Sequence, residues 1–151
     1  MTVFNGKSVY GAIVSGCVCV LKKPALRAEK RTIEDTAEEI RRFGKAKETA
    51  GSQLQELYDM YIDQIGEPNA QIFNIHMMML DDEDYCDSIT GMITDGHVNA
   101  EYAVEQTSEV FAKMLESMDN EYMRARSADI RDVCQRLISN LSGLSLIHIS
   151  E

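Results

Sequence analysis

Apolar side chains recur at every third or fourth position between Thr32 and Ile65, which predicts one amphipathic helix of about nine turns. Thr32 and Asp35 have the spacing of a capping box, with Asp in place of the usual Glu, so we expect the helix to begin at Thr32. Gly66 is expected to end it. The apolar positions of this predicted helix are Ile33, Ala37, Ile40, Phe43, Ala46, Ala50, Leu54, Leu57, Tyr61 and Ile65.

The same periodicity continues in three further helices with short connections. The second is expected to break after Leu80 and to continue from Asp82, which is a good N-cap residue. Short connections place consecutive helices antiparallel, so residues 32–143 are predicted to form two packed helical hairpins, made of four helices of which the second is broken. The expected starts are Pro68, Asn99 and Asn120, and the expected ends are Gly96 and Gly143.

Residues 1–24 have a different pattern, in which β-branched residues and glycines between Val9 and Leu21 predict one or two β-strands. Two strands alone do not make a stable sheet. We therefore expect their partners in a missing part of a longer protein or in a second copy of this chain, as a homodimer. Residues 144–151 are either a return strand or a non-native tail, and the sequence leaves both open.

Composition narrows the choice of partners. The 25 acidic residues outnumber the 15 Lys and Arg residues, and the net charge is −10. This field repels phosphate and anionic lipid, so we expect no nucleic acid and no membrane, but a positively charged protein partner. The four cysteines lack the paired spacing of a zinc site, which predicts no metal and a reducing compartment. No signal peptide is evident, and we expect a cytoplasmic protein.

Residues 72–84 carry the strongest functional signal. They contain His76 and three consecutive methionines, 77–79, followed by four acids, 81–84. An adaptable apolar surface beside carboxylates suits a partner whose apolar patch is surrounded by Lys and Arg. We expect His76 to face that partner at the rim, although a buried core histidine is the alternative. Tyr85 breaks the ligand spacing of a calcium-binding loop, so we do not expect the acids to hold a metal ion. The alternative to a partner contact is a solvated helix start, where acids interact favourably with the helix dipole.

Charged residues also line the last predicted helix. A solvated, mutually paired face is the simpler interpretation. The alternative is a polar joint, centred on Asp129, Arg131 and Asp132, where the helices meet a missing part of the protein. The residues are Arg124, Arg126, Asp129, Arg131, Asp132 and Arg136.

Several segments together resemble the N-terminal part of enzyme I, the phosphoenolpyruvate–protein phosphotransferase of the bacterial sugar phosphotransferase system. They are Ile72-Phe73 with His76, residues 80–83, residues 98–103 and, most specifically, residues 119–133. The likeness covers about residues 5–144. It implies that residues 1–24 begin a split α/β subdomain that is truncated here. It also implies that residues 32–143 are a helical subdomain that docks the phosphocarrier protein HPr.

The resemblance further implies that HPr meets the second helix, its continuation and the third helix. An apolar patch flanked by basic residues on HPr would match these acids and apolar side chains. The contact positions carried over are Glu67, Ile72, Phe73, His76, Met79, Asp82, Glu83, Asp84, Val110, Phe111, Leu115 and Arg126.

The chain also departs from this family. In the family, the phosphorylated histidine lies in a glycine-rich segment with a Ser just before the histidine, and His148 has no such context. The barrel that binds phosphoenolpyruvate and Mg²⁺ is absent, so we expect no cofactor in this fragment and no transferase activity of its own. Two rival hypotheses remain: a stand-alone helical adaptor for another basic protein, and an enzyme that acts through His76.

Overall fold

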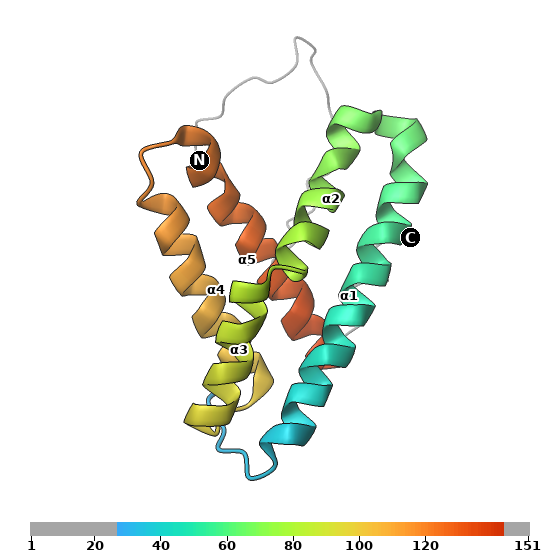
Figure 1. Cartoon of the computed structure of the whole chain (residues 1–151). Helices are drawn as coiled ribbons and strands as arrows, with labels where there is room; N and C mark the ends of the chain where they lie inside the picture. Colours follow the sequence, from blue (N-terminus) through green and yellow to red (C-terminus); the bar gives the residue numbers. More distant parts are fainter. Residues whose placement is uncertain (1–26, 144–151) are drawn as a thin grey trace, which may run out of the picture.

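The computed structural model describes residues 27–143, which form five α-helices (Figure 1). The predicted mainly helical fold is confirmed, and the second predicted helix is broken as expected, into α2 and α3. The predicted strands in residues 1–24 and the octet 144–151 lie outside the described residues. The helices are α1 (Thr36–Ile65), α2 (Glu67–Leu80), α3 (Glu83–Gly96), α4 (Ala100–Glu116) and α5 (Glu121–Leu141).

The start of α1 differs from the prediction. Asp35, and not Thr32, is the N-cap residue, and its carboxylate accepts a hydrogen bond from the Glu38 backbone N–H at 2.9 Å. The backbone of Thr32 instead forms an antiparallel bridge with Val98. This pairing joins the segment before α1 to the connection between α3 and α4. The Ile33 N–H donates to the His97 carbonyl at 2.8 Å, so the residues after Thr32 continue this pairing and do not form the first turn of a helix.

The other predicted caps are partly confirmed. Asp82 caps α3 by accepting from the Tyr85 N–H at 2.8 Å, and Asn120 caps α5 by accepting from the Tyr122 N–H at 2.9 Å. Asn99 precedes α4 but makes no side-chain cap bond to it. Its amide group is used elsewhere, as described below.

The helices form two hairpins, α1 with α2 and α4 with α5, and α3 packs against α4 (Figure 1). Tyr85 anchors the start of α3, because its buried ring meets Phe111 edge-on at 5.4 Å and its hydroxyl lies 2.6 Å from Ser108 Oγ. The two hairpins touch mainly where α5 meets α1 and α2, and they diverge at one end of the molecule (Figure 1). Beyond Leu54, no residue of α1 is buried. Fully buried side chains of the core are Leu54, Tyr85, Ile89, Ile93, Val104, Val133 and Leu137.

None of the helices that the structure describes has the length and apolar character needed to cross a membrane.

Candidate functional site

An exposed apolar row lies on the second half of α4. Ala103, Thr107, Val110 and Met114 follow one another at three- or four-residue spacing and so share one row of the helix. The first two are buried, whereas Val110 is 63 % exposed and Met114 is 49 % exposed. The row is therefore covered in the first half of α4 and emerges into solvent from Val110 onward. The start of α3 lies at this level of α4, because Tyr85 packs against Phe111 and Ser108.

Acidic residues stand beside this row. Asp82, Glu83 and Asp84 are all exposed at the start of α3, one to three residues before the anchored Tyr85. The exposed carboxylates and the exposed apolar side chains thus both lie near the point where Tyr85 packs on α4. Val110 is among the contact positions expected from the sequence, whereas Met114 is not. We call this surface the platform, and its residues are Asp82, Glu83, Asp84, Val110 and Met114.

The three methionines of α2 point in different directions. Met78 is 73 % exposed, whereas Met77 and Met79 are partly buried against the core. The three methionines therefore do not all face the interior. Ile72 is also partly buried, and Glu67 is exposed in the first turn of α2.

His76 does not lie at an exposed rim, and that prediction is wrong. The residue is buried at 9 % exposure, because α5 packs over this side of α2. Its Nε2 atom lies 3.6 Å from Asp129 Oδ1 and has no hydrogen-bond partner. The spacing of residues along α2 identified the correct helix face, but it did not reveal that α5 covers that face.

Asp129 continues the contact to the surface. Its Oδ2 atom accepts from Arg126 Nη1 at 2.8 Å, and Arg126 Nη2 donates to the Tyr122 hydroxyl at 2.7 Å. The guanidinium also lies over the Tyr122 ring, 4.4 Å from its centroid. The hydrogen bond to Asp129 raises the pKa of Arg126. We call these four residues, His76, Asp129, Arg126 and Tyr122, the His76 chain.

Three other predicted contact residues also pack inside the bundle. The ring of Phe73 stacks on Tyr61 of α1 with centroids 6.4 Å apart, so it faces α1 rather than α4. Phe111 supports Tyr85, and Leu115 is half-buried against the core. The structure therefore groups Phe111 and Leu115 next to the platform and separates Phe73 from it.

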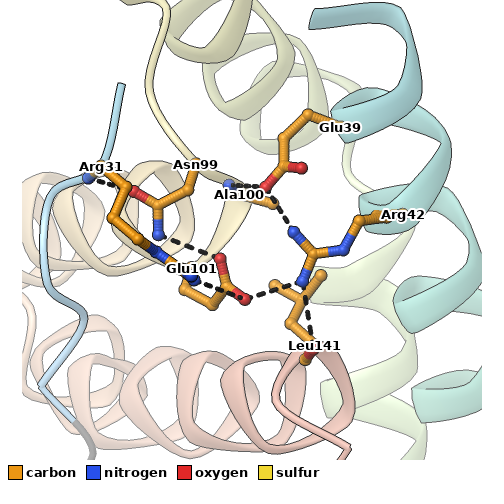
Figure 2. Close-up of polar contacts among 7 residues, drawn as sticks. All are labelled: Arg31, Glu39, Arg42, Asn99, Ala100, Glu101 and Leu141. Carbon is orange, nitrogen blue, oxygen red and sulfur yellow. Dashed lines mark hydrogen bonds and ion pairs between the residues drawn. The ribbon is translucent and has the colours of Figure 1, made fainter. Parts of the chain in front are cut away.

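A second polar cluster lies at the other end of α4, where α1 begins. Figure 2 shows Arg42 between two carboxylates: Nη1 donates to Glu39 Oε1 at 2.7 Å and Nη2 donates to Glu101 Oε1 at 2.8 Å. Arg42 Nη2 also donates to the Leu141 carbonyl at 3.2 Å, at the end of α5. Glu39 and Glu101 are 4 % and 6 % exposed. Although burial alone raises the pKa of Glu101, hydrogen bonds from Asn99 and Arg42 lower it below its usual value.

The same cluster replaces the missing cap of α4. Glu39 Oε1 accepts from the Ala100 backbone N–H at 2.7 Å, so a residue of α1 satisfies the first turn of α4 (Figure 2). Asn99 donates to Glu101 Oε2 at 3.0 Å and accepts from the Arg31 backbone N–H at 2.8 Å. We call this group the junction cluster, and its residues are Arg31, Glu39, Arg42, Asn99, Ala100, Glu101 and Leu141.

Reactive groups are scarce near the platform. Cys86 is half-buried, and burial raises the pKa of its thiol, although the Lys47 ammonium 3.5 Å away opposes this effect. A protonated thiol is a poor nucleophile. Within residues 27–143, no three His, Cys, Asp or Glu side chains are arranged to hold a metal ion.

Comparison with known proteins shows the family to which the chain belongs. Residues 5–126 match the family model described as PEP-utilising enzyme, N-terminal. The chain belongs to this family. It is 38 % identical over 145 residues to a phosphoenolpyruvate-protein phosphotransferase of Geobacillus stearothermophilus, covering 93 % of this chain and 25 % of that protein. The protein of the same name from Latilactobacillus sakei is 37 % identical over 147 residues, covering 97 % of this chain and 26 % of the relative.

Solved structures place the fold in the same family. An NMR solution structure of Enzyme I superposes with a TM-score of 0.74 at 31 % identity, covering 80 % of this chain and 49 % of that one. The N-terminal domain of Enzyme 1 - Nitrogen gives a TM-score of 0.73 at 23 % identity, covering 80 % of this chain and 50 % of that one, which supports the fold alone. The predicted resemblance to the N-terminal part of enzyme I is confirmed. The chain spans about a quarter of the length of the curated relatives.

The sequence did not single out the junction cluster of this PEP-utilising enzyme N-terminal region. A weak signal was present, since Glu39 and Arg42 are spaced for an ion pair on a helix. Glu101, the second carboxylate, is 59 residues away from Arg42 along the chain. Only the folded structure brings them together.

Proposed function

We propose that these helices form the docking surface for HPr in a phosphoenolpyruvate–protein phosphotransferase. The observation that carries this proposal is the platform, where exposed Val110 and Met114 stand beside three exposed carboxylates. A partner with an apolar patch ringed by Lys and Arg would bury the row and pair with the acids. The net charge of −10 favours the approach of such a partner.

In this proposal the chain binds and orients the carrier, and the phosphoryl transfer belongs to the intact protein. That protein would move a phosphoryl group from phosphoenolpyruvate to its own histidine and then to HPr. In the intact protein, the barrel that binds phosphoenolpyruvate would hold the Mg²⁺. The cytoplasmic location remains a prediction that follows from this role.

The direct test is an NMR titration of the isotopically labelled 151-residue chain with unlabelled HPr. We expect a dissociation constant no worse than roughly 100 μM. The shifted resonances should cluster at the start of α3 and in the second half of α4. The affinity should fall as salt is added, because the exposed carboxylates are screened.

A matched pair of variants sharpens the test. Met114→Lys puts a positive charge on the platform and should weaken binding by at least about tenfold. Met60→Lys is the control, because Met60 is similarly exposed, at 58 %, but lies on the outer half of α1. Equal loss in both variants, or no shifts with HPr at all, would reject the proposal. An absence of chemical-shift changes on addition of HPr would favour the hypothesis of a stand-alone adaptor for another basic protein.

A further inference from the structure

His76 lies where the two hairpins touch, yet one of its ring nitrogens has no hydrogen-bond partner. The Nε2 atom is 3.6 Å from Asp129 Oδ1, which is too long for a hydrogen bond but within the distance of an ion pair. Of the buried side-chain nitrogen and oxygen atoms in the described residues, only this one and Thr107 Oγ1 lack a partner. Leaving a polar atom unpaired in the interior costs free energy, so the position calls for an explanation.

Asp129 connects this buried nitrogen to the surface. One of its oxygens faces His76 and the other accepts from Arg126, so the two contacts together define the orientation of the carboxylate. The Asp129 side chain is 15 % exposed, that of Arg126 is 18 % exposed, and Tyr122 is 61 % exposed. Exposure therefore increases along the His76 chain toward Tyr122.

Arg126 has N–H donors beyond those that bind Asp129 and Tyr122. A guanidinium has five N–H groups, and the structure uses one for Asp129 and one for Tyr122. The remaining donors can bind carbonyl or carboxylate oxygens of a docked protein. Their direction depends on how the guanidinium plane is held, and Asp129 holds it from one side.

From this geometry we propose that His76 is a positioning residue, which fixes Asp129 and thereby orients the Arg126 guanidinium toward a docked protein. This rests on the proposed function, because the docked protein is HPr. His76 itself does not touch the partner. Without a polar group at position 76, the Asp129 carboxylate keeps only Arg126 and can rotate toward solvent, which frees the guanidinium to follow.

The first test needs no partner. In the 151-residue chain, NMR signals of the Arg126 guanidinium should show restricted rotation in the wild type and free rotation in His76→Leu. His76→Gln should restore the restriction, because its amide offers an N–H at similar reach. Leu80→Val is the control, since Leu80 is buried on the same helix but outside the His76 chain. Unchanged Arg126 signals in His76→Leu would overturn the proposal.

If His76→Leu does not fold, Asp129→Asn tests the same link from α5. The amide has no net charge and should hold Arg126 less firmly, so its guanidinium signals should also show freer rotation. Unaltered signals in this variant would likewise overturn the proposal.

A double-mutant cycle on HPr affinity tests the link to binding. We expect His76→Leu and Arg126→Ala each to weaken binding by about threefold to tenfold, and the double variant to lose no more than the larger single effect. Additive losses would show that His76 acts independently of Arg126 and would reject the proposal. A wild-type chain that does not bind HPr would reject only the docking function, because the guanidinium measurement stands without it.

Discussion

The junction cluster and the His76 chain both use charged side chains to join helices that are distant in the sequence, but only the junction cluster is complete. In the junction cluster, Arg42 contacts both carboxylates within hydrogen-bond distance. In the His76 chain, the contact between His76 and Asp129 is open at 3.6 Å and a buried nitrogen is left over. Buried polar networks stabilise a fold when fully bonded and cost free energy when incomplete. The complete cluster therefore stabilises the fold, whereas the incomplete chain leads from the interior to the exposed Tyr122.

The largest expected effect comes from breaking the complete cluster. Arg42→Met leaves Glu39 without its ion-pair partner and Glu101 with only the exposed Arg31, 3.6 Å away. Removing one member of a buried ion pair should lower the free energy of unfolding by about 3–5 kcal/mol. Urea unfolding followed by circular dichroism measures it. Arg41→Met is the matched control, because Arg41 is exposed and pairs with Glu38 at the surface. A loss as small as in this control would contradict the assigned role.

The pH dependence of stability tests the same cluster. The pKa of Glu101 is lowered in the folded state, so its contribution is present above the unfolded value of 4.5 and is lost as the pH falls below it. Glu101→Gln should be less stable than the wild type at pH 7. Its unfolding free energy should nevertheless fall less steeply below pH 4.5. Parallel pH profiles for the two proteins would count against the lowered pKa.

A smaller effect is expected at the support of the platform. Tyr85→Phe removes the 2.6 Å hydrogen bond to Ser108 while keeping the ring against Phe111. We expect a loss of roughly 1–2 kcal/mol in the free energy of unfolding, with Ser108 left unpaired on that side. The Tyr85→Phe/Ser108→Ala double variant should lose little more than the single one, since the two groups share the bond. Thermal and urea unfolding of all four proteins measures this.

The smallest effect on stability is expected in the incomplete chain. His76→Leu removes a buried nitrogen that has no hydrogen bond, so the free energy of unfolding should change by less than about 1 kcal/mol. Measuring the unfolding free energies of His76→Leu and Arg42→Met under the same conditions compares the two groups of residues directly. A loss of several kcal/mol here would mean that His76 holds the fold, as Arg42 does.

Much of the fold was accessible from local sequence patterns. The helices follow from apolar periodicity, and the break before α3 follows from Asp82, because capping depends on residues only three apart. The start of α1 was missed because Thr32 pairs with Val98, a contact that spacing within one helix cannot reveal. Among site residues, the acids at the start of α3 were predicted correctly as exposed. The burial of His76 depends on α5, which lies more than forty residues further along.

The junction cluster also determines where a mechanical force, applied to the two ends of the described segment, would first act. The segment before α1 is bonded to Asn99, and the last turn of α5 is bonded to Arg42, so both ends of the bundle are fastened at one place. Force applied through two tethers fused near residues 27 and 143 would therefore act first on these hydrogen bonds, before it reached the far ends of the helices.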